Sequence, residues 1–282
     1  MHFCPQRSPV KGEGPHPPTE PMNLTALLAL FDDTMRRNAS VAGCAPEITA
    51  RSSRYTTASG SLRYIMWHEF SALEAVGCID AEIAAAAGHA KALMWKLYGH
   101  DEPANLGEDL LARGFADHDP CALMAAPVTR VLAALGDTPE QVEVRQLLEP
   151  SELDAYQEIW DSVWPDAPNA RYVNDYRQLA ADRDPGVAFF AGFSPVGEPI
   201  TSGYLFHAPQ APFALLCGGA TKSAWRNRHA YSAMLAARAK CAQQRGAEYL
   251  AVEASPQSQT ILERLGFERL STLLFYEKEL SQ

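Results

Sequence analysis

Three consecutive strand-like runs, separated only by short turns, most constrain the fold of this chain. They are "VAFFAGF" (187–193), "ITSGYLFHA" (200–208) and "FALLCGGAT" (213–221), and the turns "SPVGEP" and "PQAP" between them have hairpin length. An Ala-rich run with helical spacing follows at 229–245 and stops at Gly246. The sequence therefore predicts three antiparallel strands that lead through one turn into a helix.

Further strands and helices alternate around this unit. Ser255 and Pro256 are typical of the N-cap and first residue of a helix, and Gly266 is a typical stop signal. The other elements predicted in the second half are a strand (142–148), helices (151–163 and 172–181), a strand (247–254), a helix (255–266) and a last strand (271–280).

The end of this pattern occurs twice in the chain. Residues 93–128 and 249–280 both read as a strand, a capped helix that ends in "LLARGF" or "LERLGF", a short turn and a strand. Before the first copy, residues 47–57 and 61–73 can each supply a strand, and residues 79–93 a helix. We interpret this as an internal structural duplication.

A length of 282 residues suits two domains better than one. The prediction is an α/β (α+β) protein of two domains, each a mixed, mostly antiparallel sheet flanked by helices. Residues 1–21 are rich in Pro and Gly, so we expect a disordered tail, with Met22 as an alternative natural start. The predicted domains are 22–130 and 142–282, joined by a linker at 131–141 that can begin as a short helix.

Composition and charge restrict the partners of the chain. No apolar stretch approaches the roughly 20 residues of a membrane helix, and the net charge of −10 without a basic cluster argues against nucleic acid. The six cysteines are scattered without metal-ligand spacing or a disulfide framework. We expect a cytoplasmic protein without a metal ion, a membrane partner or a nucleic-acid partner.

A turn without glycine, "WRNRHAYSAML" (225–235), joins the third strand to the long helix. The N-terminus of a helix offers backbone N–H groups without internal partners and a partial positive charge, so it favours anions. Those donors belong to the peptide and remain with any side chain except proline. We expect a phosphate-binding loop if φ is negative at His229 and Tyr231 and both side chains point away, with Arg226 and Arg228 adding positive charge. The alternative is the solvated basic start of a surface helix.

The ordered set of elements over about 142–280 resembles the GNAT superfamily of acyl-CoA-dependent N-acyltransferases. The signature of that family, Q/R-x-x-G-x-G/A, falls on Arg226 to Tyr231, and "ILERLGF" (261–267) falls on its pattern "LYxxxGF". The run "GGAT" (218–221), followed by "R-x-R-x-x-Y-x-A-x-L", looks like a subgroup of tandem GNAT proteins whose first half has degenerated.

This resemblance implies that the second half binds acetyl-CoA or another acyl-CoA. The diphosphate would meet the turn, and the pantetheine arm would pair with strand backbone in a gap that small side chains keep open. The alternative for the glycines is a β-bulge or a close helix contact. The residues expected to contact the cofactor are Gly219, Ala220, Thr221, Arg226, Asn227, Arg228, His229, Ala230, Tyr231, Ser232 and Ser255.

Glu253 and Tyr276 are the candidate catalytic residues. The tyrosine that often serves as general acid in the family falls on Leu262, which cannot donate a proton, so Tyr276 or Tyr231 would replace it. Glu253, at the end of the strand before the last helix, is the candidate base. Each has a structural alternative, as a packed ring or a solvated carboxylate. Cys217 reads as a small core residue, because direct transfer needs no acyl-carrying nucleophile.

The first half has no comparable loop. "SALEAVGC" (71–78) contains no Arg and no run like the signature, so we expect the first half to be a structural or substrate-shaping partner. His68 and Glu69 are neighbours on a strand and face opposite sides, so they cannot form an acid and base couple on one face.

The resemblance implies transfer of an acetyl or other acyl group from acyl-CoA to an amine by direct attack in a ternary complex. The expected acceptor is a small-molecule or peptide amine. Assembly into a homodimer is left as an open alternative. Leu262 and the lost glycines motivate an alternative of a different class, a catalytically silent acyl-CoA-binding or protein-interaction module. A nucleotide-binding protein is a weaker alternative, because no Walker lysine with Ser/Thr and no ribose-binding acid is placed for it.

Overall fold

The computed structural model describes residues 22–136 and 142–280. The predicted tail at 1–21 and the second part of the predicted linker lie outside these residues. Within them, no helix is both long and apolar enough to cross a membrane.

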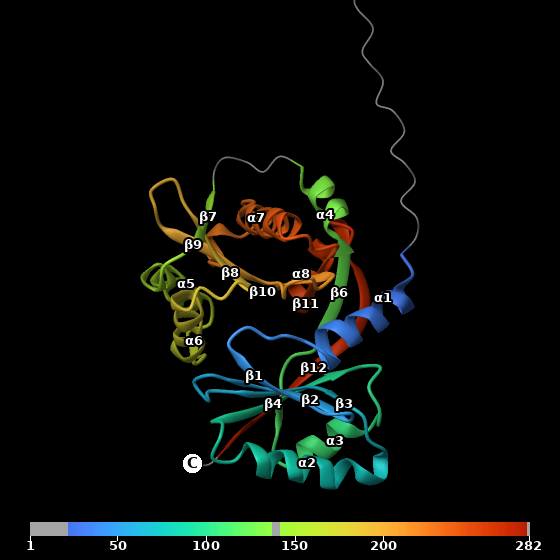
Figure 1. Ribbon diagram of the computed structural model, residues 1–282. Coiled ribbons are helices and arrows are strands. Elements are labelled where there is room, and N and C mark those ends of the chain that lie inside the picture. Colours follow the sequence, from blue (N-terminus) through green and yellow to red (C-terminus); the bar gives the residue numbers. More distant parts are fainter. Residues whose placement is uncertain (1–21, 137–141, 281–282) are drawn as a thin grey trace, which may run out of the picture.

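The strands form one 12-stranded sheet that runs through the whole molecule (Figure 1). The strands of the first half are β1 (Cys44–Ile48), β2 (Ser52–Thr57), β3 (Arg63–His68), β4 (Ala92–Tyr98), β5 (Ala116–Asp117) and β6 (Cys121–Pro127). Those of the second half are β7 (Glu143–Leu147), β8 (Val187–Phe193), β9 (Pro199–Phe206), β10 (Phe213–Thr221), β11 (Tyr249–Ala254) and β12 (Glu268–Glu279). Their order is β1-β2-β3-β4-β12-β6-β11-β10-β9-β8-β7, and β5 pairs with β12.

The two halves exchange their last strands. β6, from the first half, pairs with β11 of the second half, while β12, from the second half, pairs with β4 of the first. β6 and β12 also pair with each other, so the order around the centre is β4-β12-β6-β11. Most pairs are antiparallel, and β3 with β4 and β10 with β11 are the parallel ones among the described strands. Each of the predicted domains, 22–130 and 142–282, therefore has a strand of the other domain within its part of the sheet.

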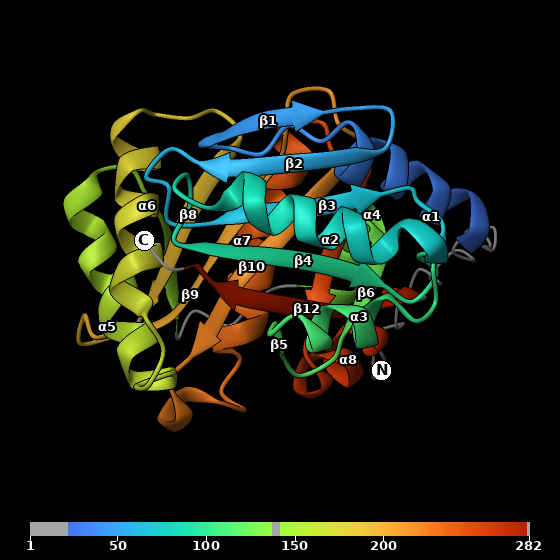
Figure 2. The ribbon, with the colours of Figure 1, turned by 90° about the horizontal axis from the view of Figure 1, so that it is seen from below.

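Helices cover both faces of the sheet (Figures 1 and 2). α7 packs across β7 to β10, whereas α5 packs on the opposite face of β9 and β10 beside α6. α2 and α3 contact each other and cover the first half. The helices are α1 (Leu24–Phe31), α2 (Ala72–Ala86), α3 (Leu106–Ala112), α4 (Val128–Leu135), α5 (Asp154–Val163), α6 (Asn169–Ala181), α7 (Ala230–Gln244) and α8 (Pro256–Arg264), with a π-helical turn at Asp32–Arg37 and 3₁₀ turns at Pro150–Leu153 and Ser223–Trp225.

Two predicted elements of the first half were wrong. The helix expected at 79–93 begins at Ala72, because Ser71 caps it and the Glu74 carboxylate accepts from the Ser71 backbone N–H at 2.9 Å. The run "SALEAVGC" is therefore mostly helix. The single strand expected at 47–57 is a hairpin, with β1 and β2 on either side of a turn at 49–51.

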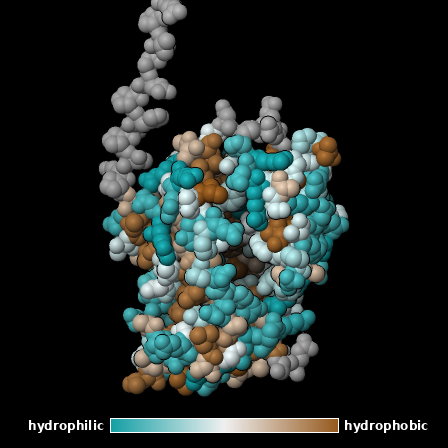
Figure 3. Space-filling view, turned by 180° about the vertical axis from the view of Figure 1, so that it is seen from behind, coloured by the Kyte–Doolittle hydropathy of each residue, from teal (hydrophilic) through white to brown (hydrophobic). Residues whose placement is uncertain are grey.

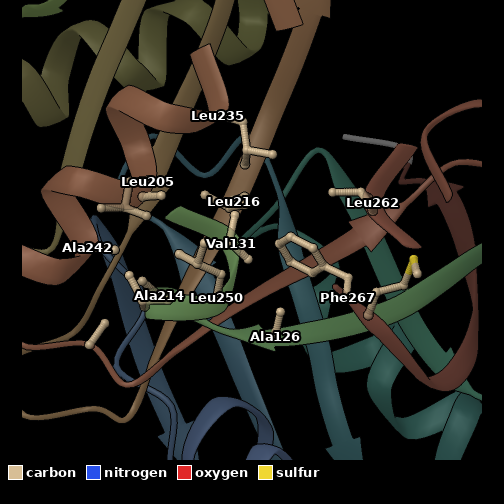
Figure 4. Close-up of a cluster of buried hydrophobic side chains, with 14 of the residues drawn as sticks. Ala126, Val131, Leu205, Ala214, Leu216, Leu235, Ala242, Leu250, Leu262 and Phe267 are labelled. Atoms are coloured by element: carbon tan, nitrogen blue, oxygen red, sulfur yellow. The ribbon is translucent and has the colours of Figure 1, made fainter. Parts of the chain in front are cut away.

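The largest hydrophobic core lies between α7, α4, α8 and the sheet (Figure 4). It draws on both halves, because Ala126 and Val131 pack with residues such as Leu216 and Leu250. Leu262, at the position where the family carries a tyrosine, is fully buried here beside Phe267. Leu262 is thus a core residue.

A second core lies under α2 and α3, and it contains a buried neutral histidine. The indole Nε1–H of Trp95 donates to Nδ1 of His68 at 3.3 Å, and Nε2 of His68 lies 3.1 Å from the Glu102 carbonyl oxygen, to which it donates. Burial lowers the pKa of His68 to about 4. His68 is therefore structural, and Glu69 next to it is exposed.

His68 should make the protein sensitive to acid. Its pKa is about 6.5 in the unfolded chain and about 4 in the folded protein, so its contribution is complete above pH 6.5 and decreases as the pH falls towards 4. Between pH 6.5 and 5 we expect a loss of about 2 kcal/mol of unfolding free energy. Urea unfolding of wild type and His68→Gln at both pH values measures it. His68→Gln should not show this loss of unfolding free energy. The control His118→Gln, at an exposed histidine, should show it as wild type does. Equal pH dependence of wild type and His68→Gln would contradict the assignment.

Candidate active site

The strands β10 and β11 separate at the level of Cys217. They pair in parallel from Phe213 to Leu216. Beyond that point β10 bulges, because its register against β9 shifts between Cys217 and Ala220, and Gly218 adopts a φ of 58°. A bulge bends the strand that carries it. The pairing therefore ends where the run "GGAT" begins.

A cavity of about 870 Å³ adjoins this point. The face seen in Figure 3 is hollowed between its upper and lower parts, with hydrophobic atoms in the hollow. Both halves line the cavity, with Tyr64, Met66 and Lys96 from the first half and Gly218, Gly219, Tyr231, Arg238 and Glu253 among those from the second. The site is thus built from residues on both sides of the exchanged strands.

The turn before α7 keeps a glycine-like backbone without glycine. Asn227 has a φ of 59°, and His229, the N-cap of α7, has a φ of 62°. The condition of a negative φ at His229, on which the expectation of a phosphate-binding loop was based, is therefore not met. Asn and His are among the residues that adopt this left-handed region most readily, at a cost of roughly 1 to 2 kcal/mol each. The loop thus retains the conformation that the family's glycine would allow.

The amides of this turn are free. Within the described part of the chain, the backbone N–H groups of residues 227–232 have no hydrogen-bond acceptor, whereas the Ala233 N–H already donates to the His229 carbonyl at 2.9 Å. An array of unbonded N–H groups at a helix N-terminus is the feature that binds anions.

The predicted cofactor residues occupy three environments. Gly219, Tyr231 and Ser255 line the cavity. Arg226, Asn227, Arg228 and His229 are exposed on the turn, where the Arg226 Nε donates to the Thr221 carbonyl at 3.3 Å and the Arg228 guanidinium lies 5.6 Å from the Trp225 ring centroid. The remaining ones are buried (Ala220, Ala230) or half-buried (Thr221, Ser232) in the elements on either side of the turn.

Glu253, on β11, faces the cavity in an ion pair with the first half. Its two carboxylate oxygens accept from the Lys96 Nζ at 2.8 and 2.9 Å, and Oε1 also accepts from the Tyr98 hydroxyl at 3.0 Å. The Lys96 and Glu253 side chains are 10% and 16% exposed, so water screens the pair little. Both oxygens of this candidate base are therefore engaged.

Tyr276 lies away from Glu253. It is 5% exposed in the core under α2 and α3, and a Cβ on Gly107 would collide with its hydroxyl. Its neighbour Phe275 lines the cavity, because successive residues of a strand face opposite sides. The position of Tyr276 does not support a catalytic role.

Leu262 occupies the position of the family's tyrosine and has no proton to donate. The hydroxyls of Ser258, one turn before Leu262 on α8, and of Ser255, the N-cap of this helix, lie on the cavity wall 3.3 Å apart. Burial raises the pKa of the Cys217 thiol to about 12, so this thiol is protonated and is a poor nucleophile. Burial also raises the pKa of Tyr231.

Two cavity residues were missed in the sequence. Lys96 lies within the apolar run "LMWKLY", and Arg238 lies within the Ala-rich helix. A lone cation in a buried element is itself a signal, because such residues are rarely buried without a partner. The partner of Lys96 could not be inferred, since Glu253 is 157 positions away.

Comparison with known proteins gives matches among structures only. No family model and no curated protein matches the sequence. A functionally unknown conserved protein from Staphylococcus epidermidis ATCC 12228 matches with a TM-score of 0.67 and 10% identity, over 89% of this chain and 98% of that chain. A tandem GNAT protein from the clavulanic acid biosynthesis pathway matches with a TM-score of 0.56 and 12% identity, over 93% and 89%.

A GCN5-related N-acetyltransferase from Kribbella flavida also matches, with a TM-score of 0.56 and 16% identity, over 90% of this chain and 93% of that chain. The chain therefore has the fold of the GCN5-related N-acetyltransferases, the GNAT fold. Since a tandem GNAT protein is matched along most of its length, the similarity extends over both halves. The predicted family resemblance and fold class are confirmed.

Proposed function

We propose that this protein transfers an acyl group from an acyl-CoA, such as acetyl-CoA, to an amine. The observation that carries the proposal is the array of unbonded amides at residues 227–232, which lies next to the strand gap and the 870 Å³ cavity. The amide array suits a diphosphate, and the cavity suits a thioester together with its acceptor. Solved structures with the same fold carry the name N-acetyltransferase.

The residues of the turn would bind the diphosphate. Their amides donate to it, and the exposed guanidinium groups of Arg226 and Arg228 add charge. The bulged β10 strand would hold the pantetheine arm beside Gly219. Transfer forms the bond between the amine nitrogen and the acyl carbon and breaks the bond to sulfur, while the amine loses one proton and the thiolate gains one. Positioning in one cavity is the main contribution of the protein.

Glu253 remains the proposed base, although its carboxylate also serves the ion pair with Lys96. A proton taken up by Glu253 weakens that pair, so the two roles compete. This competition and the buried Leu262 favour the second candidate function, an acyl-CoA-binding module without catalysis. Acetyl-CoA-dependent thiol release in the presence of an amine panel distinguishes the enzyme from the module.

The acceptor remains a small-molecule or peptide amine in this proposal. Beyond the strand gap, the cavity wall carries the rings of Tyr64, Tyr172 and Tyr176 and the carboxylate of Asp175. Aromatic faces and a carboxylate suit a cationic group. We also propose a cytoplasmic location, in keeping with five free thiols among the described residues.

A melting experiment tests binding. Acetyl-CoA should raise the melting temperature, whereas ATP and NAD should not, because a ligand that binds the native state stabilises it, and more so the tighter it binds. No shift with any acyl-CoA would falsify both candidate functions.

The double variant Arg226→Ala/Arg228→Ala should bind acetyl-CoA about 10- to 100-fold more weakly, since it loses two charge-assisted contacts to the diphosphate. Its melting temperature without ligand should be unchanged, because both side chains are exposed. The matched control is Arg264→Ala/Arg269→Ala, which removes the same charge from exposed positions on α8 and β12. Calorimetric titration measures the affinities, and equal affinity of the two double variants would place the diphosphate elsewhere.

A further inference from the structure

α7 carries a buried cation where it crosses the bulge of β10. Arg238 is 2% exposed, and the residues around it on the helix include Met234, Leu235 and Ala239, which belong to the large core. The guanidinium occupies the space above Gly203, where a Cβ would lie 2.8 Å from its Cζ. Arg238 therefore fills a gap that the sheet leaves for it.

This guanidinium has few partners. Its Nη1 donates to the Cys217 carbonyl at 3.2 Å, and its Nε makes a long contact of 3.4 Å to the Met234 carbonyl of its own helix. Nη2 has no acceptor within the described residues, and it would lie 3.9 Å from a Cβ on Gly219, which lines the cavity. The Nη2 side of the guanidinium group is thus open next to the cavity.

Other buried cations of this protein have carboxylate partners. Arg36 pairs with Asp101 at 2.7 Å and Lys96 pairs with Glu253 at 2.8 Å, while no carboxylate of the described chain lies within 4 Å of Arg238. Burial lowers the pKa of Arg238; Tyr231, Tyr156 and Cys217 act in the opposite direction, but no carboxylate is among these groups. A charge is buried at a large free-energy cost unless an opposite charge compensates it. Arg238 therefore lacks an anion that a ligand can supply.

The contacts of Arg238 distinguish this anion from a diphosphate at the turn. Its Nη1 donates to the Cys217 carbonyl and its Nη2 lies beside Gly219, both on β10, whereas the unbonded amides belong to residues 227–232. The two features would therefore meet different groups of the same donor. Arg238 lies at the bulge, beside the strand gap in which our proposed function places the reactive end of the acyl donor.

We propose that Arg238 binds a carboxylate carried by the acyl group itself, so that the donor is the CoA thioester of a dicarboxylic acid. This inference rests on the proposed acyl transfer and adds the chemical class of the donor. The planar fork of an arginine matches a carboxylate in a two-point contact. Gly219 leaves the space beside Nη2 that the carboxylate needs.

The test compares succinyl-CoA with butyryl-CoA, which has the same number of acyl carbons and no charge on the acyl group. Affinities are measured by calorimetric titration, and thiol release is followed with the amine panel. Wild type should bind succinyl-CoA at least tenfold more tightly than butyryl-CoA. Equal binding, or a preference for butyryl-CoA, overturns the inference.

The variant Arg238→Met should lose this preference and bind butyryl-CoA as well as wild type does. It removes a buried charge and keeps a long apolar side chain, and Lys240→Gln removes an exposed cation of the same helix as control. An unchanged preference in Arg238→Met overturns the inference. Should Arg238→Met not fold, Arg238→Lys keeps the charge without the fork, and its preference should be smaller than that of wild type.

Free CoA separates this inference from the proposed function. If CoA and all three thioesters, acetyl-, butyryl- and succinyl-CoA, fail to raise the melting temperature, the proposed function fails. If CoA and the thioesters bind but the succinyl group brings no advantage, the proposed function stands and the role of Arg238 is rejected.

Discussion

Lys96→Met is expected to destabilise the protein by about 3 kcal/mol. This is the lower end of the range for removing one partner of a buried ion pair. We take the lower end because the side chains of Lys96 and Glu253 are still 10% and 16% exposed. The substitution leaves the Glu253 carboxylate at the cavity wall with the Tyr98 hydroxyl as its remaining donor. Urea unfolding measures the change in the free energy of unfolding.

A double-mutant cycle isolates the pair. Lys96→Met/Glu253→Gln should recover most of the loss, because no uncompensated charge then remains. Lys222 also has two carboxylate partners, Glu158 and Glu198, but these are 56% and 47% exposed. Lys222→Met should therefore lose at most about 1 kcal/mol. Equal losses for the Lys96 and Lys222 variants would show that the pair with Glu253 is not a significant link between the halves.

Gly218→Ala is expected to cost about 2 to 5 kcal/mol. The left-handed backbone at φ 58° accounts for about 1 to 2 kcal/mol of this. Crowding accounts for about 1 to 3 kcal/mol, since the new Cβ would lie 2.9 Å from the Tyr204 ring and 3.1 Å from the Trp160 ring. Gly218 therefore permits the bulge at which β10 and β11 separate. The melting temperature and urea unfolding both report the loss.

Gly77→Ala is the matched control, because Gly77 lies inside α2, where the added Cβ would meet no described atom within 4 Å apart from its chain neighbours and the backbone of its own helix. This variant should be more stable than wild type by about 0.5 to 1 kcal/mol. If Gly218→Ala were tolerated as well as Gly77→Ala, the bulge would not depend on glycine.

Elements whose evidence lies in neighbouring residues could be predicted. The hairpin lengths of the turns and the periodicity of the runs predicted β8, β9, β10 and α7 within one or two residues. The start of α2 was also present in the sequence, as Ser71 followed by Glu74, but the Ala-rich run further on drew the prediction away from it.

Strand partners could not be predicted. A strand shows by its alternation that it is a strand, but its hydrogen bonds go to a neighbour that can lie anywhere in the chain. The similarity of 93–128 and 249–280 indicated two equivalent units, yet it did not reveal that their last strands are exchanged. The ion pair of Lys96 with Glu253 was missed for the same reason, since it joins β4 and β11 across those strands.

The candidate site was partly accessible to sequence reasoning. The turn at 225–235 identified the free amides, because peptide donors do not depend on the side chains. Arg238 gave no periodic signal that set it apart from the other residues of α7, and its significance depends on the absence of a nearby carboxylate among the residues that the structure describes. Compensation of buried charge is a three-dimensional property.

The exchange of β6 and β12 has a consequence for any attempt to separate the two halves. The first half supplies a strand to the interior of the second and receives one in return. A fragment cut at the linker would therefore lack an inner strand and would carry one whose neighbours are on the other fragment. Its unpaired strand edges would favour association with another chain.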